Sequence, residues 1–340
     1  MGNLYAAGID VGGTHYAVGI VDGSGNLLAK NARPTGAQRS FEEIIREIAE
    51  TVVLSVEQAG QKIEENAGTG FGVPSTIDPR TKKLIFANNL SWLNQDLCGE
   101  YGRYVPGPVY IDNDAGCAAL GEVMTGPGGI LGPSGERRGE EGQSALMITF
   151  GTGFGGGLVI DGKIFRGCDG FGIEPGHTVL VYGGRKCNCG NSGCVEAYAS
   201  VTALKELTRE KMAACPDSLM WEKCTGPDGS PDPDKVGGRT AFAAARKGDR
   251  AALELLEEFT SMAGQAIANL ITLYRPQKVI IGGGLCNEGD YFIKPLYEAA
   301  KKRIFGSGLM PMPPFSRARL GNDAGIVGAA MLALSGGQAR

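Results

Sequence analysis

Cys187, Cys189 and Cys194 lie within eight positions near the middle of the chain. Thiolates at this spacing, on a segment turned by glycines, can bind one tetrahedral Zn²⁺ ion. His177, ten residues before the first of them, is the natural fourth ligand. A Cys3His set leaves no open position for an activated water, so such a zinc would be structural. The alternative is three unconnected buried cysteines.

Two glycine-rich turns have the composition of phosphate-binding loops. Glycines let backbone N–H groups converge on an anion, and a threonine hydroxyl can add a further bond. Asp10 can hold a hydrated Mg²⁺, an ion that takes few carboxylates and several waters. A plain hairpin turn would explain either loop alone, but two loops in equivalent positions favour a clamp on a triphosphate. The candidate residues are Asp10, Gly12, Gly13 and Thr14 in the first loop and Gly151, Thr152 and Gly153 in the second.

Two other phosphate-binding folds are disfavoured by the residues that follow these loops. No Gly-Lys-Ser/Thr follows either loop, which excludes a Walker A sequence. Gly12 and Gly13 lead into a strand rather than a helix, which disfavours a dinucleotide fold. Gly283 and Gly284 follow a buried strand and leave room for an adenosine, although a loop at the start of a helix explains them equally well.

Asp114 follows an apolar strand and opens a helix. A carboxylate there could accept the proton of a hydroxyl that attacks a γ-phosphate. Asp is also a favoured residue at a helix N-cap, so a structural reading stays open. Asn113 offers both a donor and an acceptor to a sugar hydroxyl. Glu174 and Glu196 bracket the cysteine cluster and are either surface charges or carboxylates aimed at a polar ligand.

Composition limits the class of protein. The 340 residues suffice for two domains, and 42% hydrophobic with 21% charged residues is typical of a globular protein. A net charge of −4 does not favour nucleic acid or an anionic membrane as partner. No apolar run reaches the roughly 18 residues that a spanning helix needs, and the first residues lack the layout of a signal peptide. We therefore expect a cytoplasmic protein.

The order of the elements predicts an α/β chain with two similar lobes. A strand, a glycine turn and a returning strand occur near the N-terminus and again about 140 residues later. Ser40 and Glu43 form a capping box for a helix, and residues 250–274 predict a long one. The small-residue segment 323–334 is expected to be helical. Residues 126–142 and 215–238 have the composition of surface insertions.

Together these motifs resemble the ROK sugar kinases, a family that includes bacterial glucokinases. The resemblance covers nearly the whole chain. The cysteine segment, Cys187-x-Cys189-Gly-x-x-Gly-Cys194-x-Glu196, fits the family's zinc signature at every defined position. The other matching stretches are residues 10–14, 112–115 with Gly121 and Glu122, 151–157, and 174–177.

The resemblance implies a fold and residue roles. The fold would be two-lobed and actin/hexokinase-like (ribonuclease H-like), with a cleft between the lobes. The N-terminal lobe would span residues 1–115, completed by a C-terminal helix at about 318–340, and the C-terminal lobe would span 116–317. Asp114 matches the catalytic base. The sugar-binding residues would be Asn89, Asn113, Asp114, Glu174, His177 and Glu196.

The implied activity is ATP-dependent transfer of the γ-phosphate to a hexose, glucose to glucose 6-phosphate first, with Mg²⁺ and a structural Zn²⁺. Alternatives within the family are N-acetylglucosamine, N-acetylmannosamine, fructose and allose kinases, and outside it a sugar-sensing protein without kinase activity. Ser75, Pro175 and Gly116 depart from the family pattern. The first two could reshape the wall of the pocket and so leave the sugar open. Because His177 would touch both zinc and sugar, we expect the metal to support sugar binding more than nucleotide binding. A homodimer is expected, with no nucleic acid or membrane partner.

Overall fold

The fold is taken from a computed structural model of the chain, in which contacts define two compact units. The first comprises Met1–Met147, Gly156–Ile173 and Ala318–Arg340, and the second comprises Ile148–Gly155 and Glu174–Arg317. Residues 116–147 and 156–173, which sequence analysis assigned to the C-terminal lobe, fall in the first unit. The structure describes residues 4–78, 80–87, 90–125, 144–226, 228 and 230–337.

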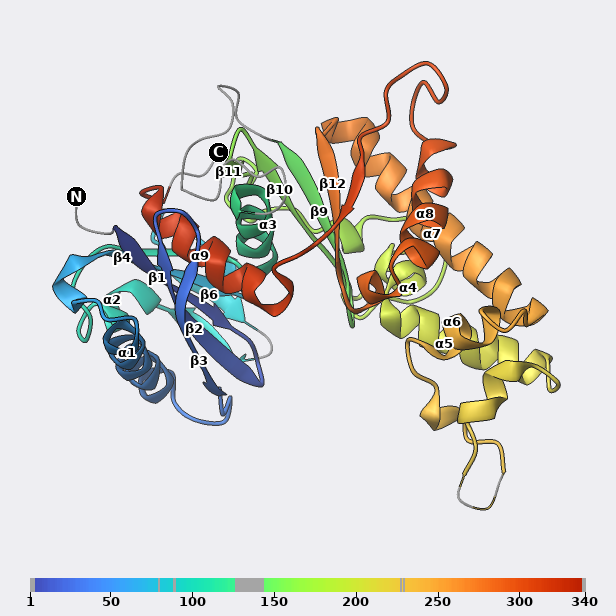
Figure 1. Cartoon of the computed structure of the whole chain (residues 1–340), viewed down its shortest axis with the longest axis horizontal. Helices are drawn as coiled ribbons and strands as arrows, with labels where there is room; N and C mark the ends of the chain where they lie inside the picture. The colour runs from blue at the N-terminus through green and yellow to red at the C-terminus, as the bar shows by residue number, and fades with distance from the viewer. Residues whose placement is uncertain are drawn as a thin grey trace. The chain divides into compact units, whose positions relative to one another are not determined.

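Two five-stranded sheets share one strand order (Figure 1). Counted along the chain within each sheet, the spatial order is third, second, first, fourth and fifth strand. This confirms the internal repeat predicted from the two glycine turns. The first sheet consists of β3 (Leu27–Pro34), β2 (His15–Asp22), β1 (Tyr5–Val11), β4 (Asn66–Val73) and β8 (Val109–Asn113). The second consists of β11 (Lys163–Ile164), β10 (Phe154–Ile160), β9 (Ala145–Phe150), β12 (Lys278–Gly283) and β13 (Phe315–Arg317).

The register of the first sheet brings acidic residues together. β1 runs antiparallel to β2 and parallel to β4, which is parallel to β8. Asp10 lies opposite Gly72, and Gly72 lies opposite Asp112. Neighbours in register point to the same face of a sheet, so Asp10 and Asp112 flank a glycine on one face. Beyond them, helix α3 (Asp114–Thr125) begins directly after β8.

The C-terminal helix α9 (Ala324–Leu334) packs against β1, β4 and α3 at backbone distance. A Cβ on Gly70 would lie 1.8 Å from the carbonyl oxygen of Ala329, and a Cβ on Gly328 would lie 1.6 Å from that of Cys117. Only glycine permits such an approach at either position. Glu122, which is buried, accepts hydrogen bonds from the N–H groups of Arg319 and Leu320 and so fixes the segment that enters α9.

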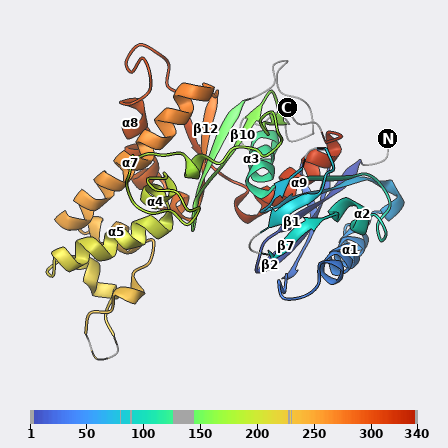
Figure 2. The same ribbon diagram turned by 180° about the vertical axis from the view of Figure 1, so that it is seen from behind.

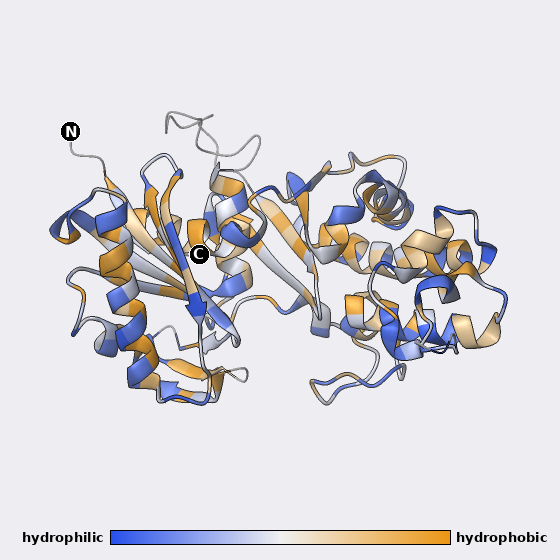
Figure 3. Cartoon of the chain, turned by 60° about the horizontal axis from the view of Figure 1, so that its bottom comes forward, coloured by the Kyte–Doolittle hydropathy of each residue, from blue (hydrophilic) through white to orange (hydrophobic). Residues whose placement is uncertain are grey.

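Helix α1 (Phe41–Gln58) packs against β2 and β3. The predicted capping box is confirmed, since the Ser40 and Glu43 side chains each accept a hydrogen bond from the other's backbone N–H. Its apolar residues follow one side of the helix (Figure 3). The first unit also contains a smaller sheet of β5 (Thr76–Ile77), β6 (Leu84–Ala87) and β7 (Trp92–Gln95), with η1 (Ile63–Glu65), α2 (Leu97–Tyr101) and η7 (Gly321–Asp323).

The second unit is built around the long helix α7 (Arg250–Tyr274), which begins and ends where the sequence predicted. α5 (Val201–Ala214) and α7 lie alongside each other in the view from behind (Figure 2). Phe292 of α8 (Asp290–Lys301) packs edge-on against Phe150 of β9 and Phe242 of α6 (Thr240–Ala245), so an aromatic cluster joins the sheet to the helices. The helices are α4 (Glu196–Ala199), α5 (Val201–Ala214), α6 (Thr240–Ala245), α7 (Arg250–Tyr274) and α8 (Asp290–Lys301), with short turns η3 (Pro175–His177), η4 (Leu219–Lys223), η5 (Pro233–Lys235) and η6 (Gly284–Glu288).

Several sequence-based element assignments needed revision. The composition of residues 151–157 predicts a single glycine turn, but residues 154–157 belong to strand β10. The predicted insertion at 215–238 contains the turns η4 and η5. The predicted insertion at 126–142 lies outside the described residues. No helix in the described part of the chain is both long enough and apolar enough to cross a bilayer.

Candidate functional site

The first glycine turn joins β1 to β2 and is held by Thr35. The Thr35 hydroxyl donates to the carbonyl oxygen of Gly12 at 2.7 Å, and its N–H donates to that of Thr14 at 2.8 Å. The N–H of Gly12 is also engaged, since it donates to the carbonyl oxygen of His15 at 2.9 Å. No described residue accepts from the N–H of Gly13 or Thr14, so these two groups and the Thr14 hydroxyl are the turn's available donors.

The Asp10 carboxylate lies against Gly325, the second residue of α9, where there is no side chain. A Cβ on Gly325 would lie 2.6 Å from Asp10 Oδ2. The pKa of Asp10 is raised to about 6. Burial is the largest cause of this pKa shift, the Asp114 carboxylate contributes to the rise, and Lys30 opposes it. Two carboxylates that are close together and largely buried favour a bound cation. One carboxylate among polar groups also suits a hydrated Mg²⁺.

Asn113 rather than Asp114 occupies the N-cap position of α3. Asn113 Oδ1 accepts from the N–H of Ala115 at 2.9 Å and from that of Gly116 at 3.4 Å. Its amide oxygen is therefore used by the helix, which leaves the amide N–H₂ as the group for a ligand. One Asp114 oxygen also accepts from Ala115 at 2.9 Å. Burial raises the pKa of Asp114, which brings its basicity closer to that needed by a general base near neutral pH.

Arg166, which the sequence analysis did not single out, pairs with the buried Asp112. Its guanidinium donates to Asp112 Oδ2 at 2.7 Å through Nε, and the Nη2 atom lies 2.6 Å from the same oxygen. Asp112 Oδ1 accepts from the N–H of Asn113 at 2.8 Å. Burial raises the pKa of Asp112 and Arg166 opposes that shift. The ion pair therefore fixes the backbone just before Asp114.

A cavity of about 30 Å³ lies beside this pair, lined by Asn113, Arg166, Ser75 and Phe171 among others. That volume holds about one water molecule. The Ser75 hydroxyl donates to the carbonyl oxygen of Phe86 at 2.8 Å. The serine that departs from the family pattern is therefore tied to the small sheet.

The second glycine turn joins β9 to β10 and has the same kind of brace. The Thr202 hydroxyl donates to the carbonyl oxygen of Thr152 at 2.7 Å, and the N–H of Val201 donates to that of Gly151 at 2.9 Å. Within the turn, the N–H of Gly151 donates to the carbonyl oxygen of Gly153 at 3.0 Å. No acceptor among the described residues faces the N–H of Thr152 or Gly153, so these are its available donors.

Gly283 ends β12 in the left-handed region, with φ 79°, and a Cβ there would lie 2.3 Å from the carbonyl oxygen of Phe150. The turn η6 begins at Gly284, so the pair does open a short helical turn. At its end the carboxylate of the buried Glu288 forms ion pairs with Arg246 at 2.5 Å and with Arg239 at 3.2 Å. These ion pairs hold the end of η6, the turn that begins at the glycines proposed to bind the adenosine.

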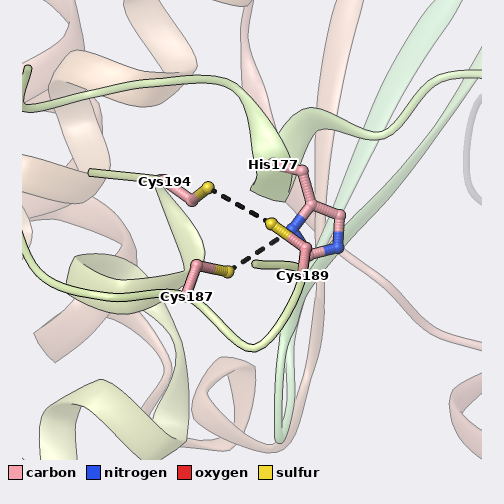
Figure 4. A group of neighbouring side chains, drawn as sticks. All are labelled: His177, Cys187, Cys189 and Cys194. Carbon is pink, nitrogen blue, oxygen red and sulfur yellow. Dashed lines mark hydrogen bonds between the residues drawn. The ribbon is translucent and has the colours of Figure 1, made fainter. Parts of the chain in front are cut away.

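The four predicted metal ligands converge (Figure 4). One ligand atom from each of His177, Cys187, Cys189 and Cys194 lies within 4.8 Å of every other. Cys187 Sγ is 3.7 Å from His177 Nδ1, and the Sγ atoms of Cys189 and Cys194 are 3.6 Å apart. A tetrahedral zinc with bonds of about 2.3 Å places thiolates about 3.8 Å apart, so the group fits that ion.

The thiol chemistry of the cluster is also consistent with a cation. Burial and the neighbouring sulfur atoms raise the pKa of Cys194 to about 12, whereas backbone hydrogen bonding at Asn191 lowers the pKa of Cys189. Three thiolates at these distances repel one another unless a metal neutralises them.

The described predicted residues are divided between the two units. Glu174 directly precedes η3, and its carbonyl oxygen accepts from the N–H of His177 at 3.1 Å. Asn89, a predicted sugar contact, lies outside the described residues. The group in the first unit is Asp10, Gly12, Gly13, Thr14, Asn113 and Asp114, and the group in the second is Gly151, Thr152, Gly153, Glu174, His177, Glu196, Gly283, Gly284 and the three cysteines.

Comparison with known proteins identifies the family of the chain. Residues 6–335 match the sequence model of the ROK family. A glucokinase of Thermotoga maritima is 36% identical over 333 residues, 98% of each chain. A glucokinase of Streptomyces coelicolor is 35% identical over 326 residues, 96% of each chain. A ROK family glucokinase from Streptomyces griseus, solved with glucose and AMPPNP, is 32% identical, with a TM-score of 0.76 over 97% of this chain and 99% of that one. The expected α/β fold of actin/hexokinase type is confirmed by these neighbours.

Proposed function

We propose that this chain, which belongs to the ROK family, is an ATP-dependent sugar kinase that transfers the γ-phosphate to a hydroxyl of glucose. The observation that carries the proposal is its similarity, over nearly its whole length, to proteins named glucokinase. The neighbouring structure with glucose and AMPPNP supports ATP as the phosphate donor. The 6-hydroxyl of glucose is the proposed acceptor.

In this mechanism Asp114 is the base. Its carboxylate accepts the proton of the attacking sugar hydroxyl, whose oxygen bonds to the γ-phosphorus while the bond to the β-phosphate oxygen breaks and ADP leaves. The Asn113 amide N–H₂ orients the sugar, since its oxygen is occupied at the helix cap. The N–H groups of Gly13, Thr14, Thr152 and Gly153 are the proposed phosphate donors. Mg²⁺, held near Asp10, would neutralise the charge on the phosphates.

The metal cluster is proposed as a structural zinc site. Four ligand atoms within 4.8 Å of one another support this, and a complete ligand set leaves no position for a reacting water. Glu174, His177 and Glu196 are proposed sugar contacts from the same segment, together with Asn89. Metal analysis of the purified protein should find about one equivalent of zinc.

A coupled assay for ADP formation tests the function. Glucose should give the highest kcat/KM in a panel with mannose, fructose, allose, N-acetylglucosamine and N-acetylmannosamine. A clear preference for another sugar would overturn glucose as the proposed substrate but would leave the proposed kinase activity in place. No transfer to any of them, with sugar binding retained in calorimetry, would favour a sugar-sensing protein. A homodimer in the cytoplasm is proposed as well, and light scattering would test the dimer.

A further inference from the structure

Glu196 belongs to the segment that carries the predicted metal ligands, residues 174–196, which we call the metal segment. Its side chain extends from there to the second glycine turn. Glu196 is the first residue of α4 and follows the predicted ligand Cys194 by two positions. Its Oε2 atom accepts a hydrogen bond from the backbone N–H of Phe154 at 3.1 Å. Phe154 is the first residue after the turn, so this carboxylate lies directly behind the proposed phosphate donors.

The contact also explains a glycine of the turn. A Cβ on Gly153 would lie 2.2 Å from Glu196 Oε2, and the three heavy atoms nearest to it all belong to Glu196. No unusual backbone angle requires glycine there, because the φ of Gly153 lies outside the left-handed region. The Glu196 carboxylate is therefore the contact that keeps the residue at this position small.

A second contact joins the same two segments. A Cβ on Gly176, which precedes the predicted ligand His177, would lie 2.2 Å from the carbonyl oxygen of Phe154. The metal segment thus meets the N–H of Phe154 through Glu196 and its C=O through Gly176. Both contacts lie within two residues of a predicted metal ligand, and all of these residues belong to one compact unit.

We infer that Glu196 is a positioning residue for the nucleotide, and that it transmits the order of the metal segment to the second glycine turn. The inference rests on the proposed function, because it takes the nucleotide phosphates as the ligand of that turn. With Oε2 engaged at Phe154, Oε1 is the oxygen left for a sugar hydroxyl. One carboxylate would then contact the sugar and the turn together, so sugar and nucleotide should each tighten the binding of the other.

Three variants separate this role from a sugar contact. Glu196→Ala removes the hydrogen bond from the Phe154 N–H to the Glu196 carboxylate, which we call the brace. Glu196→Gln keeps the length of the side chain and an oxygen that can accept from Phe154. Gly153→Ala leaves Glu196 in place but displaces its carboxylate. The probe is AMPPNP with Mg²⁺, measured by calorimetry without sugar, and equal zinc content in all variants checks that the metal segment is intact.

The brace predicts a Kd for AMPPNP about tenfold higher in Glu196→Ala and in Gly153→Ala, and within about twofold of the parent in Glu196→Gln. The double variant Gly153→Ala/Glu196→Ala should bind no more weakly than either single variant, since the added methyl group no longer meets a carboxylate. An unchanged Kd in Glu196→Ala, or additive losses in the double variant, would overturn the inference.

Hydrogen exchange at the Phe154 amide separates this test from the proposed function. The amide should be protected in the parent and in Glu196→Gln and should exchange faster in Glu196→Ala, with no ligand present. If the parent phosphorylates no sugar and this pattern holds, the kinase proposal fails and the brace stands. Equal exchange in all three proteins would sink the brace whatever the activity.

Discussion

The two glycine turns are braced alike, although one lies in each unit of the molecule. In the first, the Thr35 hydroxyl donates to the carbonyl oxygen of Gly12, and in the second the Thr202 hydroxyl donates to that of Thr152. Each turn uses its carbonyl oxygens for its own support. Each therefore leaves neighbouring N–H groups for an anion, as expected of two copies of one phosphate-binding design.

The turns differ in the charges around them. The first is accompanied by Asp10 and Asp114, two carboxylates close enough that one raises the pKa of the other. The second contains no acidic residue, and the carboxylate nearest to it, Glu196, is spent on a backbone N–H. Both turns can hold phosphate, but only the first can supply a base and a magnesium ligand. The comparison therefore supports the proposal that proton and metal-ion chemistry belongs to the first unit and nucleotide positioning to the second.

Loss of the base should have the largest effect. Asp114→Asn should lower kcat about 10²- to 10⁴-fold, since the amide cannot accept the proton. Folding should be unaffected because Asn113 caps α3, so the melting temperature and sugar affinity should stay near those of the parent. A coupled assay with a thermal melt measures both. Turnover within a few-fold of the parent would remove the base from the first unit and break the comparison.

The next effect concerns stability in the first unit. Arg166→Gln leaves the buried Asp112 carboxylate without its cation, and breaking a buried pair costs about 3–5 kcal/mol of the free energy of unfolding. The matched control is Arg185→Gln in the second unit. Its partner Glu210 is 59% exposed, so that change should cost about 0–1 kcal/mol.

Urea denaturation distinguishes the two variants. Adding Asp112→Asn to Arg166→Gln should recover part of the lost stability, because the uncompensated charge is removed. Equal losses for Arg166→Gln and Arg185→Gln would mean that Asp112 is solvated and that the acidic field of the first unit is weaker than its burial indicates.

Metal loss probes the second unit. Cys189→Ser should lower the zinc content from about one equivalent to a small fraction, because the serine hydroxyl is a poor zinc ligand. Sugar affinity should fall at least about tenfold as the segment 174–196 loosens. The sequence alone predicts that sugar affinity falls far more than nucleotide affinity. The Glu196–Phe154 hydrogen bond now predicts a smaller but measurable loss of AMPPNP affinity as well.

Cys168→Ser is the matched control, since Cys168 is exposed and lies outside the cluster. It should change neither zinc content nor either affinity in calorimetry. A parent protein without zinc would contradict the metal site. An unchanged AMPPNP affinity in Cys189→Ser would confine the metal's influence to the sugar residues.

Sequence reasoning succeeded where the determining interactions are local. The capping box at Ser40 defined the start of α1, and apolar spacing defined α7 at both ends. The four predicted metal ligands, which the structure brings within 4.8 Å of one another, could be grouped from the sequence because three of them are close in it. Strand β3 was missed because it alternates between partly buried and exposed residues and has no apolar run.

Interactions between distant segments could not be read from the sequence. Arg166 and Asp112 are 54 positions apart, and Glu196 and Phe154 are 42 apart. Nothing in the spacing of these residues marks them as partners. Asn113 and Asp114 differ by one position as candidates for the helix cap. The periodicity of a sequence does not locate the first residue of a helix that closely.

The smallest expected effect is the pH dependence that Asp10 gives to the first unit. Burial raises the pKa of Asp10 from 3.8 to about 6, so the folded state binds this proton more tightly than the unfolded state does. The associated stability is complete below about pH 4 and is lost as the pH rises through 6. Asp10→Asn, which is neutral at every pH, should therefore match the parent near pH 4 and exceed its free energy of unfolding by about 1–3 kcal/mol above pH 6.5. Melting temperatures of both proteins from pH 4.5 to 8, without metal or nucleotide, give the difference, in which other titrating groups cancel. Adding Mg²⁺ with AMPPNP should then stabilise the parent more than the variant, because the cation offsets the carboxylate charge. A difference that does not vary with pH would place Asp10 in water, and the two turns would then differ less in charge than the comparison requires.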